Sequence, residues 1–365
     1  MKVIVSGGGT GGHIYPAISI AEEIKMNIDN VEILYIGTKD SLEDTLVSGT
    51  DYIFKSIHVK GMPRKLNKKS FIAIKELFLG LSESKKIIRE FKPDIVIGTG
   101  GYVSGPVVFS ATRLKIPTVI HEQNAFPGIT NKILSRYVDK VLITFEDSRK
   151  YFKKKDNVIL TGNPLRSQIL NIDKESAYDD LNISRDKPFI VSFGGSGGQM
   201  SLNNAVLKNL PGFLKDGYQL YHITGKTNYD SFMEALNSEG IQLKENIKIF
   251  PYFNEMPKAL SIADLVITSG GAITLAEISV IGIPSILIPK AYTAENHQEY
   301  NARSFMDYGA AIMILEKELE EIDFFNVVKD LVEDKDKLTH MTMKAKELGK
   351  ANANQIIFEE IRKLI

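Results

Sequence analysis

The stretch from Ala263 to Ala302, ADLVITSGGAITLAEISVIGIPSILIPKAYTAENHQEYNA, decides the fold. It opens with the apolar run Leu265 to Thr268, which is typical of a parallel strand covered on both faces. Glycines interrupt this run, and the apolar-rich segment Ala272 to Ile281 then predicts a helix. Pro284 and the apolar letters SILI predict a second strand. A strand, a glycine turn, a helix and a strand in this order indicate an open α/β sheet.

The polar residues of this stretch fall where a ligand could meet them. The predicted helix follows Ser269 to Gly271 directly, so its free N–H groups and positive dipole end form a seat for phosphate. Glu277 lies between apolar neighbours, where a carboxylate needs paired donors. Two vicinal ribose hydroxyls would supply them, and an ordinary surface glutamate is the alternative. The loop after the second strand holds a polar cluster suited to a hydroxyl-rich ligand, although polar loops are common: Glu295, Asn296, His297, Gln298 and Asn301.

The chain begins on the same plan. Val3 to Val5 predicts a strand, and the letters GGGTGGH from Gly7 to His13 form a glycine turn into a helix. The glycines allow close backbone approach to an anion or a sugar, but the turn lacks the ending of a Walker loop and the spacing of a dinucleotide fingerprint. His13 stands near the helix N-terminus, where the dipole favours the neutral ring. A neutral ring suits a general base or a hydrogen-bond donor, and a helix-capping histidine is the alternative.

Similar segments recur through the chain. The letters DIVIGTGG begin at Asp94 and DLVITSGG at Asp264, and a predicted strand at Phe189 to Phe193 precedes the turn GGSGGQ. The segment from Thr99 to Pro106 predicts a second glycine turn in the first half. We therefore expect an α/β fold of two doubly wound Rossmann-like domains whose parallel sheets face a central cleft. The predicted domains are 1–163 with a C-terminal helix at about 347–365, and 164–346. That helix is expected to pack on the first domain, and 167–187 is interpreted as the connection.

Composition narrows the classes of function. The length of 365 residues accommodates two domains, each with its own core. Lysine plus arginine and aspartate plus glutamate both number 45, so no global field favours nucleic acid. The absence of cysteine excludes disulfides, thiolate metal sites and a cysteine nucleophile. We find no convincing metal cluster, predict no cofactor, and find no run of the ~20 apolar residues that span a bilayer. A soluble or peripheral protein is therefore expected.

Basic and apolar residues are interleaved between His58 and Leu81. The cations are Lys60, Arg64, Lys65, Lys68, Lys69 and Lys75. The apolar residues include Met62, Leu66, Phe71, Ile72, Ile74 and Phe78. Cations beside exposed apolar side chains are attracted to an anionic membrane surface, at about 1 kcal/mol per basic residue near the headgroups. A solvated loop that leads into an ordinary packed helix is the alternative.

Seven motifs follow one another along the chain: GGGTGGH, GTGGYVSGP, HEQNA, GNPLR, GGS, SGGAITLAE and HQEYNA. In this order, and over essentially the full length, the sequence closely resembles the MurG family, which adds N-acetylglucosamine to a lipid-linked muramyl-peptide precursor of bacterial peptidoglycan. The resemblance implies a GT-B fold whose C-terminal domain holds UDP-N-acetylglucosamine and whose N-terminal domain receives the polyprenyl-diphosphate-linked acceptor. It also implies a peripheral protein at the cytoplasmic face of the cell membrane, which favours the membrane interpretation of 58–81.

The resemblance assigns roles motif by motif. At the donor sugar, the resemblance places Thr10, Gly11 and Gly12 close to the sugar, Asn124 in a hydrogen bond with it and Gln298 at its hydroxyls. Arg166 and Ser196 would bind the diphosphate, and Phe253 would lie along the uracil. The nucleotide would also be contacted by Ala272, Ile273, Thr274, Leu275, Ala276 and Glu277, with Glu277 on the ribose. His13 serves in this family either in catalysis or on the acceptor diphosphate. Two positions depart from the family pattern: Gly197, where relatives usually carry glutamine or leucine, and His297, where some have glutamine.

The predicted reaction is a single inverting displacement. The acceptor 4-hydroxyl, deprotonated by His13 or otherwise by Glu122 or His121, attacks the anomeric carbon from the face opposite UDP. Glycine-turn N–H groups, the helix before Glu277 and Arg166 would stabilise the departing UDP. The alternatives are a glycosyltransferase with another lipid acceptor, a UDP-sugar 2-epimerase, a non-catalytic UDP-sugar-binding membrane scaffold and an NAD-dependent oxidoreductase.

Overall fold

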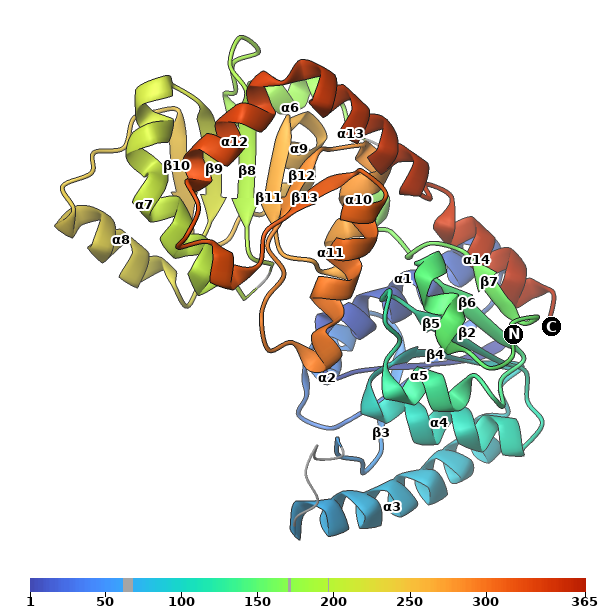
Figure 1. Ribbon diagram of the computed structural model, residues 1–365. Helices are drawn as coiled ribbons and strands as arrows, with labels where there is room; N and C mark the ends of the chain where they lie inside the picture. The colour runs from blue at the N-terminus through green and yellow to red at the C-terminus, as the bar shows by residue number, and fades with distance from the viewer. Residues whose placement is uncertain (62–67, 170–171, 196) are drawn as a thin grey trace. The chain divides into compact units, whose positions relative to one another are not determined.

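The computed structural model describes residues 1–61, 68–169, 172–195 and 197–365 (Figure 1). The chain forms two compact units. Unit 1 comprises Met1–Leu165 and Ala351–Ile365, and unit 2 comprises Arg166–Lys350. Each unit contains one parallel sheet with helices on both faces, as the sequence predicts for doubly wound domains.

Unit 1 contains a seven-stranded parallel sheet in the order β3-β2-β1-β4-β5-β6-β7. Its strands are β1 (Lys2–Gly7), β2 (Glu32–Gly37), β3 (Ile53–Ser56), β4 (Ile95–Gly100), β5 (Thr118–Glu122), β6 (Lys140–Ile143) and β7 (Val158–Leu160). Its helices are α1 (Gly11–Asn27), α2 (Leu42–Val47), α3 (Lys68–Phe91), α4 (Gly101–Arg113), α5 (Ile129–Leu134), the 3-10 helix η1 (Glu146–Tyr151) and α14 (Ala353–Arg362). Strand order reverses between β1 and β4, which makes that pair the topological switch point.

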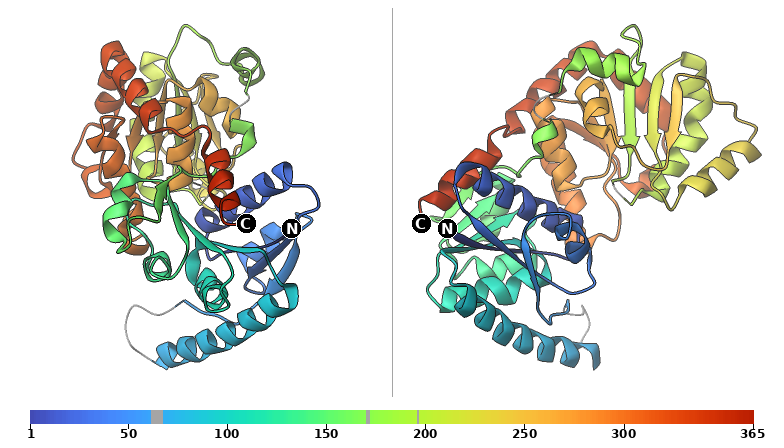
Figure 2. Two further views of the ribbon diagram at one scale, coloured as in Figure 1. Left: turned by 90° about the vertical axis from the view of Figure 1, so that its right-hand side faces the viewer. Right: turned by 180° about the vertical axis from the view of Figure 1, so that it is seen from behind.

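Helices cover both faces of this sheet (Figures 1 and 2). An apolar core lies beneath them on each face. On one face α4 packs Val103 and Val107 against the strands, and α3 packs on α4. On the other face α1 packs against the strands together with α14, which contributes Ile357 and Ile361. The last helix, α14, lies within unit 1 and contacts α1.

Unit 2 contains a six-stranded parallel sheet in the order β10-β9-β8-β11-β12-β13, with its switch point between β8 and β11. Its strands are β8 (Phe189–Phe193), β9 (Gln219–Ile223), β10 (Ile247–Phe250), β11 (Leu265–Thr268), β12 (Ser285–Leu287) and β13 (Ala311–Met313). Its helices are α6 (Lys174–Leu181), α7 (Met200–Asp216), α8 (Tyr229–Ser238), α9 (Met256–Ile262), α10 (Ala272–Ile281), α11 (His297–Asp307), α12 (Phe324–Glu333), α13 (Lys335–Leu348) and the 3-10 helices η2 (Ser167–Ile169), η3 (Ala294–Asn296) and η4 (Glu316–Glu318).

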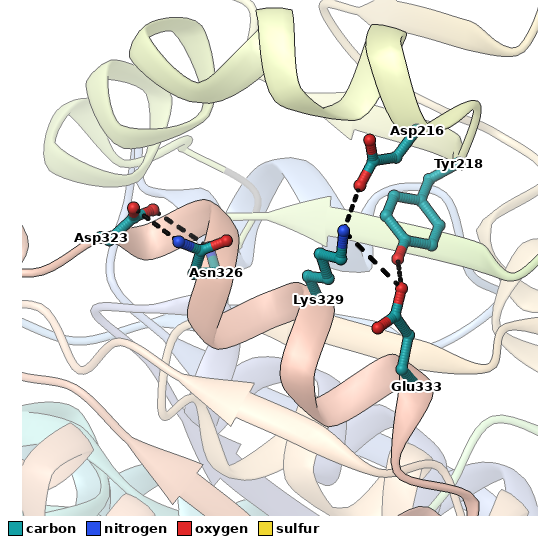
Figure 3. Close-up of polar contacts among 6 residues, drawn as sticks. All are labelled: Asp216, Tyr218, Asp323, Asn326, Lys329 and Glu333. Carbon is teal, nitrogen blue, oxygen red and sulfur yellow. Dashed lines mark hydrogen bonds and ion pairs between the residues drawn. The ribbon is translucent and has the colours of Figure 1, made fainter.

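Polar contacts fix α12 against α7 and the start of β9 (Figure 3). Asp323 caps α12 by accepting from the backbone N–H of Asn326 at 3.1 Å. Lys329 donates to Asp216 at the end of α7 at 2.8 Å, and the Tyr218 hydroxyl donates to Glu333 at 3.0 Å. Burial, and secondarily Glu333, raises the pKa of Tyr218 to about 12. These contacts hold the polar face of α12 in place, while the apolar face of α12 packs in the core of unit 2.

Three segments differ from the prediction. Thr99 to Pro106, expected as a glycine turn, is the end of β4 and the first turns of α4, because buried apolar residues hold the helix despite the hydrogen bond lost at its proline. The predicted loop from His297 to Asn301 belongs to α11, in which Asn301 takes a buried position normally held by an apolar residue. The connection expected at 167–187 contains α6, which belongs to unit 2.

Candidate functional site

In unit 1 the site lies at the carboxyl ends of β1, β4 and β5. The turn from Gly7 to His13 follows β1 and leads into α1, and Gly100 and Gly101 stand between β4 and α4. Because α1 and α4 cover opposite faces of the sheet, the strand ends leave an open edge at this point. His13, at the third position of α1, therefore stands at the switch point of unit 1.

The orientation of the His13 ring is fixed by the backbone. Its Nδ1 lies 3.1 Å from the carbonyl oxygen of Gly8, which can only accept, so a neutral ring that makes this hydrogen bond carries its proton on Nδ1 and leaves Nε2 unprotonated. The Thr10 hydroxyl lies 3.4 Å from the same Nδ1. The ring also packs on Gly100, whose φ is +109°, and a Cβ there would lie 2.8 Å from His13 Cδ2. Only glycine fits this position.

Glu122, at the end of β5, is buried within unit 1. Its carboxylate accepts from the backbone N–H and the side-chain amide of Asn124, at 3.0 and 3.2 Å, and from the backbone N–H of Gly128 at 3.2 Å. The Asn131 side chain donates to it at 2.8 Å. Burial raises the pKa of Glu122, and these donors oppose that rise. The contacts make Glu122 the anchor of the loop that presents Asn124.

His121 is fully buried on the same strand. Its Nε2 contacts the carbonyl oxygen of Gly162 at 2.9 Å, and its Nδ1 contacts the side-chain nitrogen of Gln123 at 3.0 Å. Burial lowers the pKa of His121 to about 4, against the Gly162 contact. Because both ring nitrogens are engaged within the protein, His121 is placed to hold the loop after β5 and not to meet a substrate hydroxyl. Of the three predicted bases, Glu122 and His121 are buried in unit 1, whereas His13 is partly exposed.

The corresponding edge of unit 2 brings Arg166 to α10. Nε and Nη2 of Arg166 both donate to Glu277 Oε1, at 3.0 and 2.6 Å. Glu277 is 3% exposed, and burial raises its pKa while Arg166 lowers it. The sequence indicates that the Glu277 carboxylate needs hydrogen-bond donors but does not identify them. In the structure the donors come from Arg166, a side chain predicted to contact the diphosphate.

The first turn of α10 presents some of its residues and buries others. Ala272, Ile273, Thr274 and Ala276 are partly exposed, whereas Leu275 is fully buried in the core. The N–H of Leu275 donates to the carbonyl of Gly271 at 2.9 Å. Asn301, buried on α11, donates to the carbonyl of Gly270 at 3.0 Å and so fixes the turn that precedes the helix. The sequence predicts a phosphate site at this helix end, and that assignment stays a prediction.

Lys290, directly after β12, is a residue the sequence reasoning missed. Its Nζ donates to the carbonyl of Gly198 at 2.7 Å, in the glycine turn after β8. Its backbone N–H donates to Gln298 Oε1 at 2.9 Å, so it also orients that predicted sugar-binding side chain. Burial lowers the pKa of Lys290, and Glu316 opposes the shift. The one feature of the sequence that could have pointed to Lys290 is its position directly after an apolar strand.

Phe253 and Ser196 are also predicted to contact the donor. Phe253 is partly buried in an aromatic group, with ring centroids 4.7 Å from Phe250 and 5.6 Å from Tyr221. Ser196 lies outside the described residues. Among the residues that the structure describes, no group of three or more histidine, aspartate or glutamate side chains is placed to hold a metal ion.

The segment predicted to meet the membrane is partly described, since 62–67 fall outside the described ranges. On α3 the side chains of Phe71 and Phe78 are 79% and 67% exposed. Lys75 is exposed between them, whereas Lys60 pairs with Glu76 at 3.0 Å. Ile129 and Ile133 on α5 are also exposed, at an i, i+4 spacing that the sequence reasoning missed. Within the described part of the chain, no helix combines the length and the apolarity that crossing a bilayer requires.

Comparison with known proteins identifies the family. Residues 3–143 match the glycosyltransferase family 28 N-terminal domain, and 189–357 match the glycosyltransferase family 28 C-terminal domain. The UDP-N-acetylglucosamine--N-acetylmuramyl-(pentapeptide) pyrophosphoryl-undecaprenol N-acetylglucosamine transferase of Finegoldia magna is 48% identical over all of this chain and 98% of its own length. The protein of the same name from Clostridioides difficile is 47% identical over all of this chain and 89% of its own. The chain belongs to the MurG family.

Solved structures agree with this membership of the MurG family. The crystal structure of MurG from Acinetobacter baumannii matches with a TM-score of 0.78 and 27% identity, over 99% of both chains. A UDP-GlcNAc 2-epimerase from Neisseria meningitidis bound to UDP-GlcNAc matches with a TM-score of 0.69 over the full length of both chains, at 16% identity. The second match shows a shared fold alone. The predicted GT-B fold and the resemblance to the MurG family are confirmed.

Proposed function

We propose that this protein is an inverting glycosyltransferase that moves N-acetylglucosamine from UDP-N-acetylglucosamine to the 4-hydroxyl of a polyprenyl-diphosphate-linked muramyl-pentapeptide in peptidoglycan synthesis. The names of relatives that are 44–48% identical over 99–100% of the chain support this substrate pair. The structural observation that carries the proposal is the His13 ring at the switch point of unit 1, with Nδ1 committed to the Gly8 carbonyl.

His13 is the proposed general base. Its unprotonated Nε2 takes the proton of the acceptor 4-hydroxyl as the hydroxyl oxygen bonds to the anomeric carbon of the donor. The bond between that carbon and the β-phosphate oxygen breaks, and its electron pair leaves with UDP. The proton on His13 then passes to solvent. Glu122 and Asn131 hold the loop of Asn124, which is the proposed contact to the donor sugar.

The UDP portion is assigned to unit 2. The free N–H groups at the start of α10, the glycine turn after β8 with Ser196, and the half-exposed Arg166 guanidinium would hold the diphosphate as its charge develops. Glu277 would accept from the ribose hydroxyls, Phe253 would lie along the uracil and Gln298 would read the sugar. Thr10, Gly11 and Gly12 are assigned to the sugar from unit 1. No metal ion or cofactor takes part in these steps as proposed.

Attachment to the membrane belongs to the same proposal. Phe71 and Phe78 stand on one face of α3 with Lys75 between them, at spacings of one helical turn. Apolar side chains with an adjacent cation suit the headgroup layer of an anionic bilayer. We assign this surface to the cytoplasmic face of the cell membrane, where the polyprenyl tail of the acceptor stays in the bilayer.

The test follows labelled sugar from UDP-N-acetylglucosamine in the presence and absence of the lipid-linked muramyl-pentapeptide. We expect label in the disaccharide lipid, with one UDP released per transfer and an inverted anomeric centre. Binding of the donor without UDP release would assign the protein to the scaffold class. Label in an epimerised UDP-sugar, or in another lipid such as diacylglycerol, would replace the proposed reaction by one of its rivals.

A further inference from the structure

A single peptide group links a buried carboxylate to the ring of His13. The Gly8–Gly9 peptide contains the carbonyl of Gly8 and the N–H of Gly9. The Gly9 N–H donates to Glu43 Oε2 at 3.2 Å, and the Gly8 carbonyl accepts from His13 Nδ1 at 3.1 Å. Glu43 and His13 thus contact opposite ends of one dipole, although they lie on different helices, α2 and α1.

Glu43 is enclosed on every side. It is 0% exposed, and its Oε1 accepts from the backbone N–H of Thr38 at 3.2 Å and from the Thr38 hydroxyl at 2.7 Å. A Cβ on Gly8 would lie 2.5 Å from Glu43 Oε1, so the glycine at this position lets the carboxylate reach the turn. A carboxylate held by three donors in a closed space has one fixed orientation. No role for it follows from the motifs of the sequence.

We propose that Glu43 is a positioning residue for the proposed base, acting on His13 through the Gly8–Gly9 peptide group. The negative charge at the N–H end polarises the peptide and strengthens its carbonyl as an acceptor. That carbonyl holds the proton on Nδ1, presents Nε2 as the base, and stabilises the imidazolium that forms when Nε2 takes a proton. The Glu43 carboxylate transfers no proton itself, and in this it is like the aspartate of a catalytic triad. The catalytic part of this inference rests on the proposed function.

The contact between the Gly9 N–H and Glu43 also bears on the other role considered for His13, which is binding of the acceptor diphosphate. An anion seat needs free N–H groups, but the Gly9 N–H is already taken by Glu43 and a buried negative charge lies beneath the turn. This arrangement opposes a diphosphate at Gly9 and favours catalysis. Among the residues that the structure describes, the titratable groups around the turn are Glu43 from α2, Tyr35 from β2, Tyr102 from α4 and Tyr15 from α1. Tyr35 donates to the Gly7 carbonyl at 2.6 Å, Tyr102 faces Gly9 and Tyr15 faces Gly11.

The test replaces Glu43 by glutamine, which keeps the shape and removes the charge. In Glu43→Gln we expect kcat to fall about 10- to 100-fold, with KM for UDP-N-acetylglucosamine changed by less than about threefold. The acid limb of the kcat–pH profile should move to lower pH, because the imidazolium loses its stabilising charge. The matched control is Asp139→Asn. Like Glu43, Asp139 accepts from the N–H and the hydroxyl of one threonine, here Thr118, but it lies at the amino ends of the strands. The Asp139→Asn variant should retain the wild-type kcat and pH profile.

A second measurement needs no turnover. With 15N-labelled histidine, and the His13 signals assigned by their loss in His13→Ala, the wild-type ring should carry its proton on Nδ1, and Glu43→Gln should shift population toward the Nε2–H form. A wild-type ring protonated on Nε2 would overturn the inference, even if Glu43→Gln failed to fold. An unchanged tautomer and pH profile in a folded Glu43→Gln would overturn it as well. If the wild type transferred no sugar but showed the Nδ1–H form and its loss in Glu43→Gln, the positioning role would stand and the proposed function would fail.

Discussion

Arg166 and Glu277 form an ion pair within unit 2, in which Nε and Nη2 of the arginine share one carboxylate oxygen at 3.0 and 2.6 Å. The carboxylate is buried, and the guanidinium is half exposed. The sequence assigned the two side chains to different parts of the donor, the ribose and the diphosphate. Their contact orients the carboxylate and balances its charge within the protein, so the proposed binding of ribose at Glu277 would not have to desolvate an isolated charge.

Glu277→Ala should raise KM for UDP-N-acetylglucosamine about 10- to 100-fold while kcat changes less, because the proposed ribose hydrogen bonds to a charged acceptor are lost equally in the ground and transition states. Steady-state kinetics over a range of donor concentrations measures both constants. Glu234→Ala, which removes an exposed carboxylate on α8, is the control and should leave KM unchanged. An unaltered KM in Glu277→Ala would remove the ribose assignment.

Arg166→Met should destabilise unit 2 by about 1–3 kcal/mol, because it leaves the Glu277 carboxylate buried without its charged donor. Adding Glu277→Gln to Arg166→Met should restore part of this loss. Urea unfolding of the two single variants and the double variant gives the coupling free energy directly. Strictly additive losses would show that the ion pair contributes nothing to stability.

His13→Ala should lower kcat about 100-fold or more and leave KM for the donor nearly unchanged, because a base acts in the transition state and not in donor binding. Thr10→Val is the companion variant, since it removes the second contact to His13 Nδ1 and leaves the Gly8 carbonyl in place. It should have a much smaller effect on kcat. Turnover that survives His13→Ala would mean that another group removes the proton.

His222 should make unit 2 sensitive to acid. It is fully buried on β9 beside Ser192, and burial lowers its pKa to about 3, so the folded state keeps the ring neutral while the unfolded chain binds a proton below about pH 6.5. The stabilisation is complete above pH 6.5 and is lost as pH falls toward the folded pKa. Between pH 6 and 4 the free energy of unfolding of the wild type should fall more steeply than that of His222→Asn, by about 1.4 kcal/mol per pH unit. The exposed His340→Asn is the control and should keep the wild-type slope.

Phe71→Ser combined with Phe78→Ser should weaken binding to anionic vesicles about 10-fold or more, because two exposed apolar side chains no longer enter the headgroup layer. Sedimentation with vesicles of anionic and of neutral lipid, at low and high salt, separates the apolar and electrostatic contributions. Met343→Ser, which removes an exposed apolar side chain on α13, is the control. Equal binding of the double variant and the wild type would place the membrane contact elsewhere.

Much of the fold could be predicted because its signals are local. The strand β11 and the helix α10 begin and end at the predicted residues, since an apolar run bounded by glycine and proline leaves few alternatives. The prediction was wrong where polar or breaking residues lie in a buried helix. Pro106 in α4 and Asn301 in α11 both conceal a helical pattern, and only packing against the sheet stabilises those segments as helices.

By itself the sequence determined the two α/β halves, the glycine turns after their strands and the family, because strand periodicity, turn chemistry and motif order are properties of neighbouring residues. Only the tertiary structure decided which polar groups meet. Arg166 and Glu277 are 111 positions apart, and Gly9 and Glu43 are 34 apart. A carboxylate's partners depend on where the sheet brings distant segments together, and no local pattern encodes that. The sequence therefore predicts where the ligand loops lie, whereas the tertiary structure determines which side chains hold one another in place.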